Sequence, residues 1–263
     1  MDIMKTRDLT IKIQNKEILN NINLSFLTGK TTAIIGPNGS GKSTLLKALA
    51  GLNNNIIGQV LFENRDIREF SKKNLARNLA ILPQDPSVPA DLTVSELVQY
   101  GRFPYQQWFA RNDKEDQQCV QWAMQQTKIE EFKDRFVTTL SGGERQRTWI
   151  AMALAQKPKV LLLDEPTTYL DIAHQLEVMQ IIDSLTQKYN ITIIMVLHDI
   201  NQALQYANDL VVIKNQRVFA QGSPQKILSE NLVETVFGVT ADFFTNRLGK
   251  KVLVPISLVK ADG

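Results

Sequence analysis

The chain of 263 residues carries a formal net charge of +3, and 43% of its residues are hydrophobic and 22% charged. These values are typical of a globular protein with a sizeable buried core, and they exclude a disordered or fibrous chain. The single cysteine, Cys119, excludes an internal disulfide framework and a metal site built from several thiolates.

Alternating apolar residues predict an N-terminal pair of strands over 9–13 and 18–26, joined by a polar turn at 14–16. A turn at 28–29 leads to a β-branched strand over 31–35, which is followed by a Leu- and Ala-rich helix over 43–50. After a loop at 51–58, further strands are expected over 59–62 and 79–82.

From Asp85 onward the pattern becomes rich in loops, with Pro86, Pro89 and Pro104, and helical patterns follow over 94–100 and 114–126. This predicts a mostly helical subdomain, roughly residues 85–157, inserted between strands. Strands are then expected over 160–163, 191–197, 210–213 and 217–220, and helices over 174–188 and 200–207. Near-continuous apolar strands separated by helices indicate a mainly parallel sheet covered on both faces. The last stretch, 233–263, is expected to pack on the main body, with a strand-like run over 252–259.

The apolar segments are too short to cross a membrane. The longest, such as residues 191–197, fall far below the ~20 residues that a spanning helix needs, and the first residues lack the apolar core of a secretory signal. The net charge is mildly positive, and the sequence contains no long block of Lys and Arg. This mildly basic balance suits an anionic ligand or a membrane surface. We therefore expect any membrane role to come through partner proteins, and we expect no nucleic-acid partner.

A phosphate-binding loop of the form G-x-x-x-x-G-K-[ST] lies between the predicted strand 31–35 and the helix after it. Its glycines allow successive N–H groups to point inward at a helix N-terminus, where an anion is favoured. A simple glycine-rich turn is the alternative, but strand, loop, lysine, serine and helix in this order favour a nucleotide site. We expect the nucleotide to contact Gly36, Pro37, Asn38, Gly39, Ser40, Gly41, Lys42, Ser43 and Thr44.

The buried strand over 160–163 is followed by two carboxylates, Asp164 and Glu165. Ligand sites in parallel sheets lie beyond the C-terminal ends of the strands, which is the edge that also carries the phosphate loop. Asp164 is therefore placed to hold Mg²⁺, and Glu165 to orient or deprotonate an attacking water. Taken alone, the pair has an equally good alternative, a strand that leaves the core through charged residues.

The segment 140–144 reads Leu-Ser-Gly-Gly-Glu and has a structural and a functional interpretation. Ser141 and Glu144 predict a capping box that opens a helix running to about residue 156. A capping box does not require Gly142 and Gly143, however, and consecutive glycines at a helix start allow a phosphate to approach the backbone. These residues resemble the signature motif of ATP-binding cassette (ABC) ATPases.

The resemblance extends over nearly the whole chain. The family's loop glutamine corresponds to Gln84, its D-loop to Tyr169-Leu170-Asp171, and its switch histidine to His198, all in the family's order. The resemblance implies one ABC ATPase domain over residues 1–263 with an α/β P-loop fold. In that fold an N-terminal antiparallel β subdomain and an inserted helical subdomain accompany a mainly parallel sheet.

The resemblance also implies a head-to-tail homodimer that holds two ATP molecules, with the phosphate loop of one subunit facing Ser141, Gly142 and Gly143 of the other. Asp171 would organise the dimer seam and also lie at the nucleotide. The implied catalytic residues are Lys42, Gln84, Glu165 and His198, and the implied Mg²⁺ ligands are Ser43, Gln84 and Asp164.

One position departs from the family's pattern. Similar proteins place an aromatic residue in the first hairpin, stacked on adenine, and Ile13 stands there in this chain. A lost stacking contact is worth about 0.5 to 1.5 kcal/mol. We therefore expect ATP to be preferred over GTP by less than about tenfold, and a much larger measured preference would contradict this interpretation.

Within the family, segments 99–104, 165–172 and 198–203 look most like ATPases of bacterial importers for iron(III) siderophores, haem or cobalamin. A siderophore importer is the first hypothesis. It implies two membrane permease subunits, an extracellular substrate-binding protein that acts through the permease, and a peripheral location at the cytoplasmic face of the membrane. The alternatives are a haem or cobalamin importer ATPase and a soluble ABC ATPase that acts as an assembly factor or scaffold. A small-molecule phosphotransferase is poorly supported because it leaves 141–144 unexplained.

Aromatic residues concentrate in a loop-like part of the predicted helical subdomain. Two interpretations stay open: a small subdomain core, and a docking groove for a short cytoplasmic helix of the permease. The residues concerned are Tyr100, Phe103, Tyr105, Trp108 and Phe109.

Overall fold

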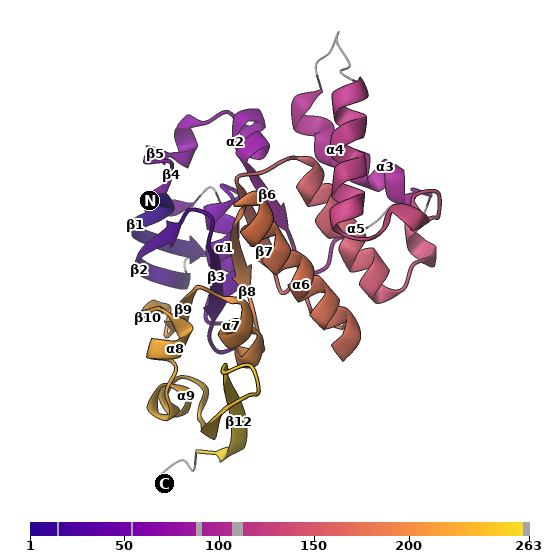
Figure 1. The fold of residues 1–263 in the computed structure, drawn as a ribbon. Helices are drawn as coiled ribbons and strands as arrows, with labels where there is room; N and C mark the ends of the chain where they lie inside the picture. The colour runs from indigo at the N-terminus through magenta and orange to yellow at the C-terminus, as the bar shows by residue number, and fades with distance from the viewer. Residues whose placement is uncertain (15, 54, 88–90, 107–112, 260–263) are drawn as a thin grey trace. The chain divides into compact units, whose positions relative to one another are not determined.

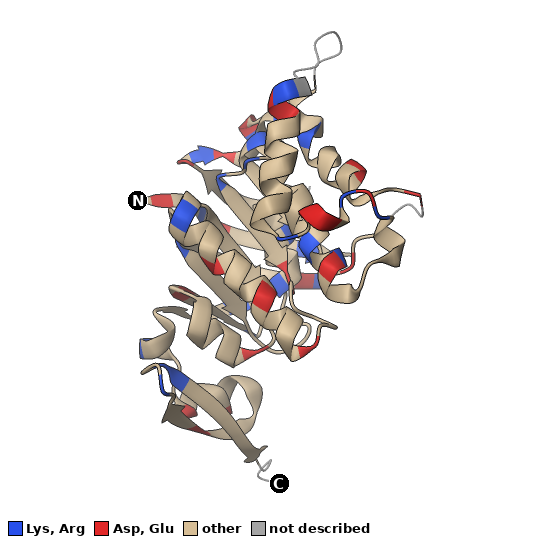
Figure 2. Cartoon of the chain, turned by 45° about the vertical axis from the view of Figure 1, so that its right-hand side comes forward, with Lys and Arg blue, Asp and Glu red and all other residues tan. Residues whose placement is uncertain are grey.

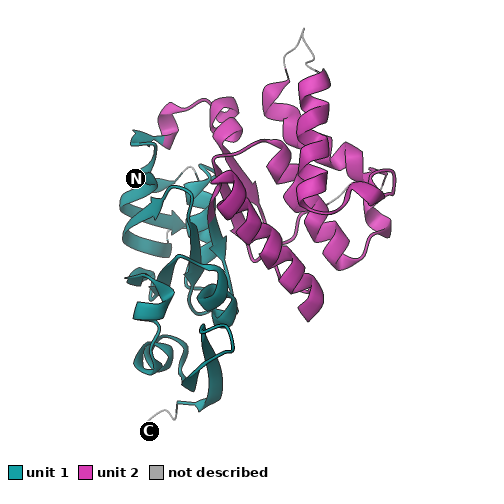
Figure 3. Cartoon of the chain, in the orientation of Figure 1, with its two compact units in different colours: residues 1–66, 194–263 teal, residues 67–193 magenta. Residues whose placement is uncertain are grey.

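The computed structural model describes the whole chain except residues 15, 54, 88–90, 107–112 and 260–263. It forms two compact units, Met1–Asp66 with Ile194–Gly263, and Ile67–Ile193 (Figure 3). The division falls inside strand β8 (Thr192–Val196), so each unit contains part of that strand. Among the described residues, none of the helices combines the length and hydrophobicity needed to span a bilayer. The boundaries predicted for the helical subdomain, 85–157, stay a prediction.

The first unit begins with an antiparallel sheet of strand order β2-β1-β4-β5. Its strands are β1 (Asp2–Ile13), β2 (Lys16–Leu27), β4 (Ile56–Phe62) and β5 (Arg65–Asp66). The predicted antiparallel pair is confirmed, although β1 begins seven residues earlier than expected, at Asp2 rather than residue 9. Strand β4 also begins earlier than predicted and continues through Gly58. Gly58 (φ +84°) lies against the irregular pairing of β1, where a Cβ atom would lie 2.4 Å from two carbonyl oxygens.

The parallel strands of the first unit place the phosphate loop. Strands β10 (Arg217–Gly222), β9 (Asp209–Lys214), β3 (Thr31–Ile35) and β8 lie in this order, with β3 and β9 parallel and β10 antiparallel to β9. All residues of β3 are buried, as its continuous apolar and β-branched sequence predicts. Helices α1 (Lys42–Leu49) and α7 (Ile200–Tyr206) follow β3 and β8 in the chain.

The C-terminal part of the first unit contains two helices and a hairpin, of which the sequence predicted only the last strand. They are α8 (Pro224–Ile227), α9 (Glu230–Phe237), β11 (Val239–Thr245) and β12 (Lys251–Leu258). The side chain of Asn201, in α7, donates to the carbonyl of Leu253 at 3.0 Å and accepts from its N–H at 2.8 Å. These hydrogen bonds confirm that this stretch packs on the main body of its unit.

The second unit joins a set of strands to a group of helices. Its strands β8, β7 (Val160–Asp164) and β6 (Leu79–Leu82) lie in this order, and β6 and β7 are parallel. Figure 1 shows α3, α4 and α5 gathered together, and these helices contact one another. The α-helices are α2 (Lys72–Asn78), α3 (Val94–Gln99), α4 (Asp113–Gln126), α5 (Gly142–Ala155) and α6 (Ile172–Tyr189), and the short 3₁₀ helices are η1 (Ile67–Glu69), η2 (Tyr100–Tyr105), η3 (Glu130–Phe132) and η4 (Val137–Thr139).

The aromatic stretch expected to be loop-like begins as the 3₁₀ helix η2, which a buried arginine anchors. The Arg102 guanidinium pairs with Asp116 at 2.7 Å, donates to the carbonyl of Ala155 at 2.8 Å and lies 3.9 Å from the ring centroid of Tyr105. Tyr105 is half-buried, which fits the core interpretation, whereas Tyr100 and Phe103 are exposed. The predicted aromatics Trp108 and Phe109 lie outside the described residues.

In Figure 2, positions of Lys and Arg and positions of Asp and Glu both occur along the helices in view, as expected for helices with solvated faces.

Candidate functional site

The phosphate loop of the first unit has a backbone that only glycine accommodates at its first position. A Cβ atom at Gly36 (φ +152°) would lie 2.1 Å from the carbonyl oxygen of Ile213. Gly41 caps helix α1 in a left-handed conformation (φ 101°), which glycine adopts without strain. The sequence pattern therefore marks a turn that brings the loop backbone to the start of α1.

The side chain of Lys42 folds back onto carbonyl groups of this loop. Its buried Nζ donates to the carbonyl oxygens of Gly36 and Pro37, at 2.9 Å each. The hydroxyl of Ser40 is also buried, and it has no hydrogen-bond partner among the residues that the structure describes. A buried hydroxyl without a hydrogen-bond partner lowers the stability of a folded protein. The Ser40 hydroxyl therefore offers a hydrogen-bond donor and acceptor to any group that enters the loop.

His198 lies in the same unit as the phosphate loop and follows strand β8. The N–H of Leu197 donates to the carbonyl of Ile34 at 3.1 Å. Ile34 is two residues before Gly36 and Leu197 is one before His198, so both motifs begin at the same end of neighbouring strands. The side chain of His198 is exposed there.

The second unit brings together Gln84 and Glu165, which are 81 positions apart in the chain. Because β6 and β7 are parallel with Leu82 opposite Leu163, both residues stand two positions beyond a matched pair. The Gln84 amide donates to Oε2 of Glu165 at 2.5 Å, and the Thr168 hydroxyl donates to the same oxygen at 3.1 Å. The Glu165 carboxylate is thus held from two sides.

Two further features set the backbone around this carboxylate. Glu165 has a left-handed backbone (φ 53°), an uncommon conformation for a residue with a side chain, and it turns the chain sharply out of the strand. Asp164, the last residue of β7, is buried. The buried Asp164 carboxylate at the end of the strand is therefore followed by a half-buried one, Glu165.

The segment 140–144 forms the capping box that the sequence predicts. The Ser141 hydroxyl accepts from the Glu144 N–H at 3.3 Å, and the Glu144 carboxylate accepts from the Ser141 N–H at 2.7 Å. The hydrogen bond from the Ser141 N–H lowers the pKa of Glu144 below its ordinary value. Helix α5 therefore starts in a fixed geometry with Gly142 and Gly143 in its first turn.

Asp171 caps the next helix, α6. Its carboxylate accepts from the His174 N–H at 2.9 Å and contacts Nδ1 of the same residue at 2.8 Å. The backbone hydrogen bond, followed by the side-chain one, lowers the pKa of Asp171. Asp171 is the last residue of the predicted D-loop, Tyr169-Leu170-Asp171, in which Tyr169 is 92% exposed.

The predicted site residues divide between the two units. The phosphate loop and His198 belong to the first, and Gln84, Ser141, Gly142, Gly143, Asp164, Glu165 and Asp171 to the second. Sequence reasoning missed Thr168 and His174 as partners of Glu165 and Asp171. A hydroxyl three residues after a carboxylate, and a histidine three residues after a helix-capping aspartate, were the available signals.

Ile13, which stands where similar proteins place an aromatic residue, is the last residue of β1. Its side chain is 49% exposed and lines, with Leu52 and Asn53, a cavity of about 290 Å³. Whether the missing aromatic changes base selectivity stays a prediction.

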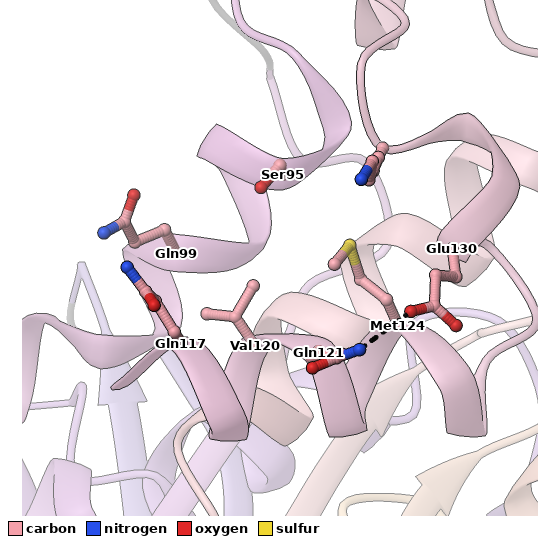
Figure 4. A pocket seen from close by; sticks show the side chains of 8 residues that line it. Ser95, Gln99, Gln117, Val120, Gln121, Met124 and Glu130 are labelled. Carbon is pink, nitrogen blue, oxygen red and sulfur yellow. Dashed lines mark hydrogen bonds between the residues drawn. The ribbon is translucent and has the colours of Figure 1, made fainter. Parts of the chain in front are cut away.

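A larger cavity of about 400 Å³ lies in the second unit, away from these motifs (Figure 4). Three of its eight lining residues are glutamines, and one of them, Gln121, donates to Glu130 at 3.2 Å. Its lining residues are Ser95, Gln99, Gln117, Val120, Gln121, Met124, Glu130 and Lys133.

Comparisons with known proteins agree with the motifs. The family model described as "ABC transporter" matches residues 19–168. The chain is 42% identical to the iron(3+)-hydroxamate import ATP-binding protein FhuC of Bacillus subtilis, covering 99% of this chain and 97% of that protein. It is 44% identical to the petrobactin import ATP-binding protein FpuD of Bacillus anthracis, covering 96% and 93%.

The fold agrees as well. A dimeric structure of MJ0796, a bacterial ABC transporter cassette, superposes with a TM-score of 0.73 at 28% identity, covering 84% of this chain and 98% of that one. These matches confirm the resemblance first drawn from the nucleotide motifs and the expected P-loop fold. The chain belongs to the ABC transporter family and is one of its ATP-hydrolysing, ATP-binding subunits.

Proposed function

We propose that this chain powers the import of an iron(III) chelate, most simply an iron(III)-siderophore, as the ATPase subunit of an ABC importer. The observation that carries the proposal is its similarity, over nearly the full lengths, to import ATP-binding proteins for iron(3+)-hydroxamate and petrobactin. Haem and cobalamin are the alternative cargoes. A purified transporter whose ATP hydrolysis rises with binding protein loaded with ferric hydroxamate, and not with haem or cobalamin, would distinguish them.

We propose the phosphate loop as the binding site for the ATP phosphates. Carbonyl groups of the loop hold the Lys42 ammonium group in place. When ATP binds, this group exchanges these contacts for phosphate oxygens without a large movement. The buried Ser40 hydroxyl gains a partner when an anion fills the loop. Pro37, Asn38, Gly39 and Thr44 complete the proposed contact surface.

The residues present fit a magnesium ion, because all the proposed ligands offer the hard oxygen atoms that this ion prefers. They are the Ser43 hydroxyl, the Asp164 carboxylate and the Gln84 amide oxygen. When bound, the ion neutralises charge that develops on the phosphates.

In the proposed reaction, Glu165 orients a water molecule and accepts its proton. The water oxygen forms a bond to the γ-phosphorus, the bond from that phosphorus to the bridging oxygen breaks, and ADP leaves with the electron pair. Gln84 and Thr168 keep the carboxylate in place for this step. His198 is proposed to contact the γ-phosphate.

We propose that two copies of the chain close around two ATP molecules. Ser141, Gly142 and Gly143 of one subunit complete the site on the phosphate loop of the other, and Asp171 lies at the seam. The dimeric cassette structure among the similar folds supports this arrangement. The γ-phosphate then links the subunits, and its removal by hydrolysis allows them to separate.

Two permease subunits are the proposed membrane partners, and a substrate-binding protein outside the cell is proposed to act through them. The chain would then lie at the cytoplasmic face.

Tyr100 and Phe103 support a docking surface for the permease, because both rings are exposed and their centroids are 5.1 Å apart. Nucleotide state would reach this surface through Gln84 and the proposed helical subdomain, residues 85–157.

The substitution Glu165→Gln tests the catalytic proposal. It should leave ATP binding within about twofold of the parent, lower turnover about 100-fold or more, and convert the subunit to a dimer in MgATP. Light scattering and a phosphate-release assay measure these effects. Hydrolysis at the parental rate would show that Glu165 is not the water-orienting carboxylate.

A further inference from the structure

The ring of His174 connects two motifs of the second unit. Its Nδ1 lies 2.8 Å from the Asp171 carboxylate in the D-loop. The other side of the ring lies against the start of α5, where a Cβ atom at Gly143 would meet Cδ2 at 2.0 Å, Cγ at 2.5 Å and Nε2 at 2.9 Å. One side chain therefore contacts both the capping residue of α6 and the second glycine of α5.

We infer that His174 is a positioning residue that locks the D-loop to the start of α5, so that both reach the partner subunit as one rigid edge. The inference rests on the proposed function, since it concerns the ATP-bound dimer. His174 itself is given no contact with nucleotide.

The two glycines of the segment have different reasons to be glycine. At Gly142 a Cβ atom would lie 3.6 Å from a Leu170 side-chain carbon, which is an ordinary contact. At Gly143 the three nearest atoms all belong to His174, and all lie closer than a Cβ atom tolerates. Gly143 is therefore needed to admit the ring, independently of any approach by phosphate.

Neighbouring contacts hold the same edge. Arg147, one turn along α5 from Gly143, pairs with Glu177, three residues after His174. The Gln175 amide donates to the carbonyl of Leu170 at 2.9 Å. The backbone of the D-loop and the packing of α5 on α6 are thus fixed around His174, which alone among these contacts joins Asp171 to Gly143.

The edge that His174 supports is exposed and apolar. Tyr169 is 92% exposed and Ile172 is 78% exposed, on either side of Asp171 in the chain. Large apolar side chains exposed this way favour a protein interface. Misplacing this edge should therefore affect dimer formation while leaving nucleotide binding by a single subunit unchanged.

The test uses the full chain with Glu165→Gln, in which ATP-driven dimers accumulate. Adding His174→Ala should raise the MgATP concentration for half-dimerisation about tenfold, while a fluorescent ATP analogue binds the monomer within about twofold of the parent. Gln187→Ala, an exposed residue of the same helix α6, is the matched control and should change neither value. Dimerisation of the His174→Ala chain at the parental MgATP concentration would overturn the inference.

A double variant separates the ring contact from other roles of the glycine. Gly143→Ala should abolish dimerisation and lower the melting temperature, and Gly143→Ala with His174→Ala should recover the melting temperature to the level of His174→Ala alone. If the double variant melts as low as Gly143→Ala, the ring is not what excludes a side chain at this position and the inference is wrong. If the Glu165→Gln chain itself stays monomeric with its permease present, the proposed function fails, and the recovery of melting temperature still tests the His174 contact.

Discussion

Two helix starts that the sequence marks with glycine, α1 and α5, are built in opposite ways. Helix α1 begins at the left-handed Gly41, and within the described residues no side chain caps it. Helix α5 begins at Ser141 with a complete capping box. The first start has no side chain competing for an incoming anion, whereas the second is ordered by its own side chains before any ligand arrives.

Helix α3 shows that the capping box by itself has no catalytic meaning. Thr93 and Glu96 form the same reciprocal pair as Ser141 and Glu144, with the backbone N–H at 2.8 Å from the carboxylate. Helix α3 continues with Val94, which is buried. The glycine pair and the His174 ring distinguish α5, so α3 provides an internal control.

The largest effect is expected at the start of α1. Lys42→Ala removes a buried ammonium group from the loop and should weaken ATP binding about 100-fold or more. Titration with a fluorescent ATP analogue measures it. Lys47→Ala, on an exposed face of the same helix, should leave binding unchanged. Tight binding by the Lys42→Ala chain would remove the lysine from the proposed site.

Alanine at Gly36, in the loop before α1, and at Gly142, in the first turn of α5, should change the free energy of unfolding differently. Gly36→Ala forces a Cβ atom to 2.1 Å from a carbonyl oxygen at φ +152°, and it should lower the free energy of unfolding by about 1 to 3 kcal/mol. Gly142→Ala meets only an ordinary contact at 3.6 Å, and it should preserve or raise that free energy by up to about 1 kcal/mol. Urea unfolding compares them, and an equal loss in both would show that the two starts are built alike.

The two capping boxes give a matched pair. Ser141→Ala and Thr93→Ala should each lower the free energy of unfolding by about 1 kcal/mol. Only Ser141→Ala should also raise the MgATP concentration needed for dimerisation in the Glu165→Gln chain. Equal effects on dimerisation would mean that the Ser141 hydroxyl contributes through helix stability alone.

The smallest effect is a pH dependence of the α5 cap. Hydrogen bonding to Ser141 lowers the pKa of Glu144 from 4.5, so its contribution to stability is fully present above that value. The contribution is lost as pH falls through the lower pKa of the folded state. The stability difference between the parent and Glu144→Gln should therefore shrink below pH 4.5, as thermal unfolding across pH measures. A difference that stays constant would exclude a role for the charge.

The sequence alone determined the parts of this protein whose chemistry is local. A phosphate loop needs glycines, a lysine and a hydroxyl in fixed order, and a capping box needs Ser141 and Glu144 three residues apart, so both can be identified without a structure. The buried strands before the phosphate loop and before Asp164 were also predicted, because a continuous apolar run has few other uses.

Only the tertiary structure decided which distant residues meet. The pairing of Gln84 with Glu165 depends on the register of β6 against β7, and the contact of His174 with Gly143 depends on how α5 packs on α6. The extra helices α2, α8 and α9 and strand β11 were missed for a related reason, since short elements are stabilised by packing more than by propensity. Local patterns fix the chemistry available to each segment, whereas contacts across the fold are selected by close packing of the whole chain.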